Sequence, residues 1–115
     1  MSVTIYHNPR CSKSRQTLKL LEEKGLEPKV ILYLETPPTP DELLEILIMM
    51  DKGARDIIRK SEAPYKELEL SDPSLDDDAL VQAMCGNPVL IERPIVVNDD
   101  KAAIGRPPEN VLAIL

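Results

Sequence analysis

Aromatic side chains are scarce in this sequence of 115 residues, which holds three tyrosines but neither phenylalanine nor tryptophan. A hydrophobic core must therefore be built mainly from leucine, isoleucine, valine and methionine. Long apolar runs are also absent, since no stretch approaches the roughly 20 apolar residues that a membrane-spanning helix needs. The first residues resemble a strand rather than a signal peptide. These two absences favour a cytoplasmic protein without a membrane segment.

Metal ligands and an excess of positive charge are absent as well. One histidine and two widely separated cysteines offer no ligand spacing, so we predict no metal site. The formal net charge of −6 argues against a nucleic-acid-binding surface. Residues 1–21 nevertheless carry four cations and no anion: Arg10, Lys13, Arg15 and Lys19. A local basic region on an acidic chain suits a small oxyanion better than a polyanion.

The N-terminal part of the sequence has a strand–helix–strand pattern. Residues 3–7 predict a strand, and the helix that follows could be capped by Ser12 or Ser14 and should end at Gly25. The continuous apolar run over residues 29–34 is typical of a strand buried on both faces of a parallel sheet. Together these elements predict a βαβ unit.

The remainder of the chain predicts a helical stretch, then a hairpin and a last helix. We expect helices at 39–50 after a Thr39–Glu42 capping box, at 54–60 and from Ser74 to Gly86, strands at 89–91, 95–97 and 102–104, and a terminal helix from Pro107 with Val111, Leu112 and Leu115 inward. This order is typical of an α/β, thioredoxin-like fold with a helical insertion between an N-terminal βαβ part and a C-terminal ββα part. We predict one domain over residues 1–115. In such folds the proline that opens the third strand is cis and lies against the thiol, which makes Pro94 the candidate.

One cysteine, Cys11, stands where the first strand gives way to the first helix. Unpaired N–H groups and the helix dipole at such a place favour the thiolate, which is the reactive form of cysteine. The alternative is a buried structural thiol, but a loop rich in proline and basic residues makes apolar burial difficult. Cys85 lies near a helix end among ordinary neighbours, and packing is the better interpretation there. We therefore predict Cys11 to be a nucleophilic or redox cysteine.

Ser14 and His7 flank this cysteine. A dithiol mechanism would need a second thiol at position 14, so the C-x-x-S arrangement favours an external thiol instead. Ser14 could donate a hydrogen bond to the thiolate or merely cap the helix, and the two roles are compatible. His7 could tune the thiol or orient the loop, or it could be a strand-end residue bonded to backbone.

Three arginines outside the loop are candidates for anion binding: Arg59, Arg93 and Arg106. Arginine presents a rigid fork of donors that matches a tetrahedral oxyanion, and it stays charged. Each one alone is more often a solvated surface residue. Arg93 and Arg106 both precede a proline, which holds the backbone extended and aims the side chain. The spacing of these arginines in the sequence does not show whether their side chains converge on Cys11.

Several motifs, taken together, carry a family resemblance along nearly the whole chain. They are Ile5-Tyr6-His7-Asn8-Pro9-x-Cys11-x-x-Ser14-Arg15, Leu34-Glu35-x-Pro37-Pro38, Ile57-Ile58-Arg59-Lys60, Glu92-Arg93-Pro94-Ile95-Val96-Val97 and Gly105-Arg106-Pro107. The sequence resembles the glutaredoxin-coupled arsenate reductase family, and it looks closest to the shorter chromosomal branch. Arg10 stands where the resistance enzymes of that family usually have a small residue.

The resemblance implies a function and a set of roles. Cys11 would attack arsenate to form an arsenic–sulfur ester, Arg59, Arg93 and Arg106 would bind the oxyanion, and His7 and Ser14 would tune the thiolate. Glutathione, as co-substrate, would displace the adduct, and glutaredoxin would reduce the mixed disulfide while arsenite is released. The resemblance implies no bound cofactor.

Two other functions compete with arsenate reduction. One is a glutathione-dependent thiol reductase that acts on an organic or protein substrate. The other is a redox-related transcriptional adaptor of the same fold, of the kind that senses through a C-x-x-C pair. Ser14 removes that sensor, and the three arginines would lack a purpose. The adaptor therefore ranks below both enzymes.

Overall fold

The computed structural model describes residues 3–115. Residues 3–36 and 93–115 form one compact unit, called the sheet unit below, and Pro37–Glu92 form a second, called the helical unit. Single-domain organisation over residues 1–115 stays a prediction. No helix within residues 3–115 is long and apolar enough to cross a membrane.

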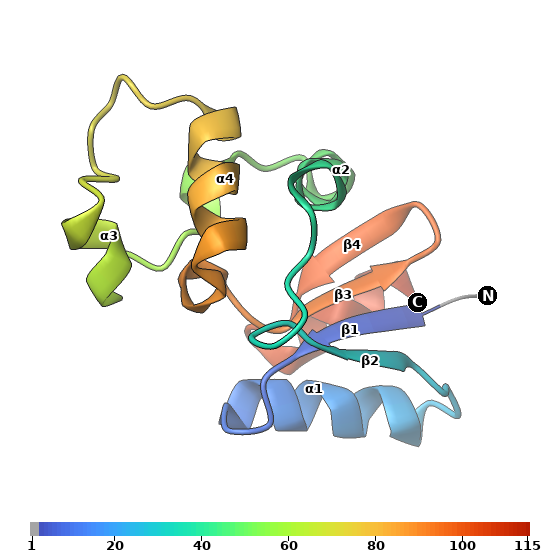
Figure 1. Ribbon diagram of the computed structural model, residues 1–115. Coiled ribbons are helices and arrows are strands. Elements are labelled where there is room, and N and C mark those ends of the chain that lie inside the picture. The colour runs from blue at the N-terminus through green and yellow to red at the C-terminus, as the bar shows by residue number, and fades with distance from the viewer. Residues whose placement is uncertain (1–2) are drawn as a thin grey trace. The chain divides into compact units, whose positions relative to one another are not determined.

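The sheet unit is built on four strands in the order β2-β1-β3-β4 (Figure 1). β1 (Val3–His7) pairs in parallel with β2 (Lys29–Leu32) and antiparallel with β3 (Ile95–Asn98). β4 (Lys101–Ile104) pairs antiparallel with β3 as the second arm of a hairpin. This topology confirms the predicted thioredoxin-like α/β fold, with its βαβ part and its hairpin contributing to one sheet.

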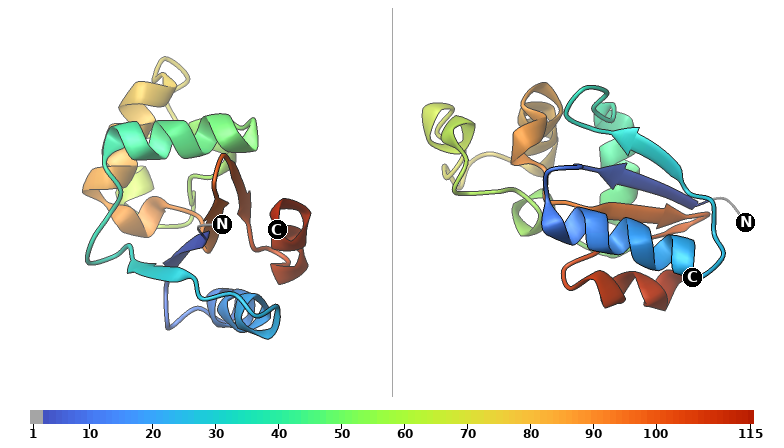
Figure 2. Two further views of the ribbon diagram at one scale, coloured as in Figure 1. Left: turned by 90° about the vertical axis from the view of Figure 1, so that its right-hand side faces the viewer. Right: turned by 90° about the horizontal axis from the view of Figure 1, so that it is seen from below.

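Two helices of the sheet unit lie side by side against the sheet (Figure 2). They are α1 (Ser12–Glu23) and the 3₁₀ helix η3 (Pro108–Ile114). The core between them and the strands is aliphatic, as the scarcity of aromatic residues predicted. Its buried members are Val3, Ile5, Leu21, Val96 and Val111.

α1 ends just before Gly25, as the sequence predicted. Gly25 has a positive φ of 78°, and the N–H of Leu26 donates to the carbonyl of Leu21 at 3.2 Å. This is the pattern of a Schellman motif, which needs a left-handed residue just after the helix. Glycine adopts that conformation without strain.

β2 is not buried on both faces, so that expectation is wrong. Val30 and Leu32 are 43% and 38% exposed, and within residues 3–115 the strand pairs with β1 alone. The strand also stops at Leu32, and residues 33–35 continue as a turn. A continuous apolar run marks a buried strand only when both faces of the sheet are covered. Val30 and Leu32 are two residues apart and share one face, and that face is partly open here.

The helical unit contains three α-helices and two short 3₁₀ helices: α2 (Pro40–Met50), η1 (Ala54–Asp56), α3 (Ala63–Glu67), α4 (Asp77–Gly86) and η2 (Pro88–Leu90). The predicted capping box opens α2, because Thr39 Oγ1 accepts the N–H of Glu42 at 3.2 Å and the Glu42 carboxylate accepts the N–H of Thr39 at 2.9 Å. α2 packs on α4. Their buried side chains include Leu43, Ile46, Leu47, Leu80, Val81 and Met84.

Several sequence-based expectations for short elements are wrong. The helix expected at 54–60 is a single 3₁₀ turn, after which Ile58 forms an isolated antiparallel bridge with Ile91. The strand expected at 89–91 is the 3₁₀ turn η2, because Pro88 has no N–H to donate to a sheet. The short helix α3 was not expected. The last helix is of the 3₁₀ type, and Leu112 and Leu115 are 40% and 37% exposed rather than inward.

Candidate active site

Cys11 lies at the junction of β1 and α1. Its N–H donates to the carbonyl of Asn8 at 3.0 Å, and its own carbonyl accepts the N–H of Arg15 at 3.0 Å as the helix begins. Cys11 is therefore the N-cap residue of α1, and it is half-buried. The expectation that Ser12 or Ser14 caps the helix is wrong, because the cysteine itself takes that place.

The pKa of the Cys11 thiol lies below its ordinary value. Desolvation by burial is the largest influence and raises this pKa, but other groups together outweigh it. They are, in order, the backbone N–H of Ser14, the guanidinium of Arg106, the charge of Arg93 and the backbone N–H of Lys13. The Cys11 side chain makes no full cap hydrogen bond, so the N–H groups act as dipoles at the helix start. The net effect favours the nucleophilic thiolate.

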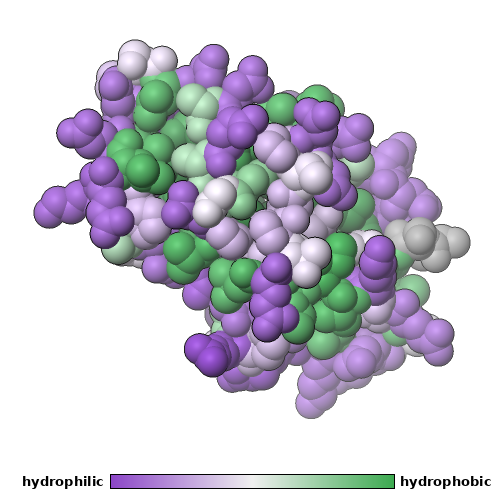
Figure 3. All heavy atoms as spheres, in the orientation of Figure 1, coloured by the Kyte–Doolittle hydropathy of each residue, from purple (hydrophilic) through white to green (hydrophobic). Residues whose placement is uncertain are grey.

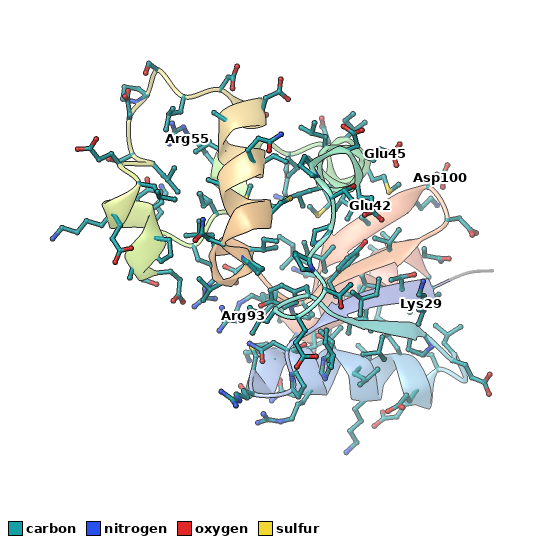
Figure 4. The ribbon with its side chains drawn as sticks, in the orientation of Figure 1. Lys29, Glu42, Glu45, Arg55, Arg93 and Asp100 are labelled. Carbon is teal, nitrogen blue, oxygen red and sulfur yellow. The ribbon has the colours of Figure 1, made fainter. Side chains whose placement is uncertain are left out.

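Two of the three predicted arginines belong to this environment. Nη1 of Arg106 lies 3.7 Å from Sγ of Cys11 and donates to the carbonyl of Arg93 at 3.1 Å. Arg93 (Figure 4) is half-buried and acts on the thiol through its charge. The peptide bonds before Pro94 and Pro107 are both cis. The cis form at Pro94 confirms the prediction made for that residue.

His7 and Ser14 form a buried pair next to the thiol loop. His7 Nδ1 lies 2.6 Å from Ser14 Oγ, which also accepts the N–H of Asn8 at 3.0 Å. Burial lowers the pKa of His7, and the charge of Arg15 lowers it further, so the imidazole is neutral at neutral pH. The Ser14 hydroxyl therefore faces an imidazole and the loop backbone, while its N–H acts on the sulfur. Thiolate tuning by His7 and Ser14 stays a prediction.

Two residues to which the sequence analysis assigned no role in shaping the loop, Asn8 and Arg15, hold it in shape. Asn8 accepts the N–H of Arg10 on its side-chain oxygen at 3.0 Å, in addition to its two backbone hydrogen bonds. Nη1 of Arg15 donates to the carbonyl of Pro9 at 2.8 Å. An Asn-Pro step is a turn signal, because asparagine often bonds to the backbone two residues on. That signal could have identified Asn8.

Arg59, the third predicted arginine, belongs to the helical unit. Its Nε lies 3.2 Å from a carboxylate oxygen of Glu62, and its Nη1 lies 3.0 Å from one of Glu92. Its backbone N–H donates to the carbonyl of Leu90 at 2.7 Å. Within its own unit Arg59 is thus the centre of two ion pairs. Its role in oxyanion binding stays a prediction.

Cys85 lies on α4 in the helical unit, in surroundings unlike those of Cys11. Burial raises the pKa of the Cys85 thiol, and the negative charge of Glu42 (labelled in Figure 4) raises it further. A protonated thiol is a poor nucleophile. This environment supports the interpretation of Cys85 as a packing residue.

No three His, Cys, Asp or Glu side chains within residues 3–115 lie close enough together to hold a metal ion. The groups that act on Cys11 are cationic donors and the N–H groups of the helix start. A cysteine among such groups can attack an electrophilic centre, and the donors can hold the oxygens of an anion while it does so.

The sheet order, with a cysteine at the start of the helix that follows the first strand, defines a thioredoxin-like α/β protein. The chain belongs to the ArsC family, whose model matches residues 6–114. This membership confirms the resemblance to arsenate reductases that the sequence motifs indicated.

Individual relatives match almost end to end. An arsenate reductase of Neisseria meningitidis serogroup A is 50% identical over 98% of this chain and 97% of its own length. An uncharacterized protein, YfgD, of Escherichia coli strain K12 is 60% identical over 98% of this chain and 96% of its own length. Among solved structures, an arsenate reductase from Vibrio cholerae is 55% identical and has a TM-score of 0.96, covering 100% of this chain and 98% of that one.

Proposed function

We propose that this protein is an arsenate reductase whose nucleophile is Cys11 and whose reductants are glutathione and glutaredoxin. The observation that carries the proposal is the position of the Arg106 guanidinium, 3.7 Å from the Cys11 sulfur. It places a permanent cation beside the thiol, and this cation is one of the groups that lower the pKa of Cys11. Membership of the ArsC family and similarity to proteins named arsenate reductase support the choice of substrate.

The first chemical step joins the thiolate to arsenate. The Cys11 thiolate attacks arsenic(V), a sulfur–arsenic bond forms, and one arsenate oxygen leaves as hydroxide or, once protonated, as water. Arg93 and Arg106 hold the remaining oxygens through charge-assisted hydrogen bonds, which are stronger than neutral ones. The same donors stabilise the negative charge that builds up in the transition state. By the family resemblance Arg59 contributes to the same task.

The second step supplies the electrons. Reduction of arsenic(V) to arsenic(III) needs two electrons, and two thiols provide them by becoming a disulfide. A glutathione thiolate attacks the Cys11 sulfur, the sulfur–arsenic bond breaks, and its electron pair stays with arsenic, which leaves as arsenite. Ser14 stands where a dithiol protein would hold a resolving thiol, so the second thiol comes from outside the chain.

The third step regenerates the thiol. A glutaredoxin thiolate attacks the glutathione sulfur of the mixed disulfide, and Cys11 leaves as a thiolate that its surroundings already stabilise. A thiol of low pKa is the better leaving group in such an exchange. A reaction that consumes reduced glutathione needs a reducing compartment, which is why we place it in the cytoplasm.

One assay tests the proposal directly. Purified protein is incubated with arsenate, glutathione and glutaredoxin, and the release of arsenite is followed. We expect Cys11→Ser to abolish the reaction and Cys85→Ser to leave most of it. Equal losses in both variants would indicate a relay between the two thiols instead.

The same variants distinguish the competing enzyme. A glutathione-dependent thiol reductase would release no arsenite but would reduce a small disulfide, such as hydroxyethyl disulfide, through Cys11. A protein inactive in both assays would leave the transcriptional adaptor as the function to pursue.

A further inference from the structure

A pocket opens beside the thiol loop within the sheet unit. It has a volume of about 390 Å³, and it lies between residues 7–10 and three residues at and just after the end of β2, namely Leu32, Leu34 and Glu35. β1 and β2 run parallel with His7 opposite Leu32, so both strands deliver their following loops to the same edge of the sheet. Pockets for small ligands typically hold about 300–1,000 Å³. The pocket therefore suits a ligand at the small end of that range.

The lining of this pocket combines an apolar surface with one charge of each sign. Leu32 and Leu34 line the pocket and are 38% and 44% exposed. The space-filling view shows apolar surface over the region of β2 (Figure 3). Arg10 and Glu35 are both exposed lining residues. Neither takes part in an ion pair among residues 3–115. A cation and an anion are thus both available to a zwitterionic ligand.

Arg10 differs in placement from the arginines of the anion site. It precedes Cys11 directly in sequence, yet it is not among the groups that lower the pKa of that thiol, whereas Arg93 and Arg106 are. Arg10 is a lining residue of the pocket instead. Arg10 belongs to the thiol loop, whereas Arg93 and Arg106 come from the segments before β3 and after β4. Arg10 is therefore available for a ligand other than the oxyanion.

We propose that this pocket binds the peptide thiol that attacks the Cys11 adduct, with Arg10 holding a carboxylate and Glu35 holding the ammonium group. The inference rests on the proposed function, which requires an external thiol at Cys11. Glutathione is a tripeptide with two carboxylates, one ammonium group and its thiol on the central residue, so its charges match the lining. Leu32 and Leu34 would contact its methylene groups.

The size of the ligand is compatible with attack on Cys11 from this pocket. An extended tripeptide spans about 10 Å, and neighbouring Cα atoms lie about 3.8 Å apart. A carboxylate held by Arg10 therefore keeps the thiol of the central residue within reach of the adjoining Cys11. The covalent step is the attack on the Cys11 sulfur described above, with the electron pair of the broken sulfur–arsenic bond passing to arsenic.

Steady-state kinetics provide the first test. Arsenate is held at saturation, glutathione is varied, and Arg10→Ala, Arg10→Glu and Glu35→Ala are compared with wild type. We expect the KM for glutathione to rise about five- to tenfold, as for the loss of one charge-assisted contact, while the KM for arsenate stays within about twofold. Lys24→Ala and Glu27→Ala serve as matched controls, since both residues are exposed in the same unit and lie outside the pocket lining.

Cysteamine, a thiol without a carboxylate, is the second probe. With cysteamine as the thiol, Arg10→Ala should change the rate constant by less than about twofold, because cysteamine has no carboxylate for Arg10 to bind. An unchanged KM for glutathione in all three variants, in an enzyme that still depends on Cys11, would overturn the pocket proposal and leave the proposed function intact. Activity that survives Cys11→Ser would overturn the proposed function itself.

Direct binding gives a readout that is independent of turnover. S-Methylglutathione cannot react, and its titration into the protein should shift the NMR signals of residues 8–10 and 32–35 in a saturable manner. Arg10→Glu should weaken this binding about tenfold. NMR shifts confined to residues outside the pocket would refute the proposal. Variants that alter the KM for glutaredoxin but leave the KM for glutathione unchanged would refute it too, and would assign the pocket to glutaredoxin instead.

Discussion

The guanidinium of Arg106 reaches the sulfur of Cys11 at 3.7 Å although the two residues lie 95 positions apart in the sequence. The same Nη1 donates to the carbonyl of Arg93, and the backbone carbonyl of Arg106 accepts the side-chain amide of Asn110 at 3.0 Å. Arg106 is therefore held at both its backbone and its guanidinium. Under the proposed function, this cation stabilises the thiolate and is also in the right place to hold the oxyanion that the thiolate would attack.

Removal of the Arg106 guanidinium should raise the pKa of Cys11 and weaken arsenate binding. The contact lowers the thiol pKa in the folded protein, so Arg106→Ala leaves less thiolate at neutral pH. We expect the KM for arsenate to rise about tenfold or more, since a hydrogen bond to a charged group contributes about 1.5–3 kcal/mol. Titration of thiolate absorbance near 240 nm measures the pKa.

Alkylation kinetics check the same contact by a second route. In wild type the rate with iodoacetamide should rise with pH and level off at a lower pH than for a free cysteine, because only the thiolate reacts. In Arg106→Ala the plateau should move to higher pH. Lys101→Ala is the matched control, since Lys101 is an exposed cation of the same unit. Identical pH profiles for wild type and Arg106→Ala would show that the contact between Arg106 and Cys11 does not activate the thiol.

Elements decided by neighbouring residues were predictable from the sequence, and those decided by distant ones were not. The stop of α1 at Gly25 and the capping box at Thr39 depend on residues within one helical turn, and both are present. The exposure of Leu32 depends on whether another part of the chain covers that face of β2, which no local pattern encodes. The bridge between Ile58 and Ile91 is likewise a long-range pairing, and both segments read locally as something else.

In the candidate site too, features set by neighbouring residues could be predicted from the sequence, and features set by distant residues could not. Cys11 could be found because strand, loop and helix follow one another directly, and position in that order is a local property. The contact of Arg106 with the sulfur depends on how the segment after β4 returns to the thiol loop, so spacing could not predict it. The hydroxyl of Ser14 could have faced either the thiolate or the histidine. The structure pairs it with His7, a choice made by tertiary packing.

The neutral state of His7 should make stability depend on pH. Burial and the charge of Arg15 lower its pKa in the folded protein, whereas in the unfolded chain it titrates at about 6.5. At pH values between the folded pKa and about 6.5, the unfolded chain binds more protons at His7 than the folded protein does. The contribution of neutral His7 to the free energy of unfolding is therefore fully present above about pH 6.5 and is lost as the pH falls through the folded pKa. Urea denaturation of wild type and His7→Asn across pH 5–8 measures this, and the difference between them should shrink as pH falls. A pH-independent difference would show that His7 does not titrate in this window.

Ser14 should contribute to stability through its hydroxyl. Ser14 is fully buried, and its removal leaves the Asn8 N–H and the His7 Nδ1 without their partner. An unsatisfied buried polar group costs about 1–3 kcal/mol, so Ser14→Ala should lower the free energy of unfolding by that amount. Ser12→Ala, exposed in the same helical turn, should change it by less than about 0.5 kcal/mol. Equal effects of the two variants would contradict the buried pair.

Gly105 should be the position where a single methyl group disturbs the site most. A Cβ there would meet the side chain of the buried Thr17 and lie 2.9 Å from Cγ of Pro94, so Gly105→Ala must displace α1 or the proline ring. Because Arg106 is the next residue, we expect a raised pKa of the Cys11 thiol together with a loss of about 1–3 kcal/mol in stability. Thr17→Ala removes two of the three close contacts and leaves only that with Pro94. The double variant should therefore recover part of both losses, with a favourable coupling energy in a double-mutant cycle. Additive losses would show that the two residues do not compete for space, and that Arg106 is positioned by other contacts.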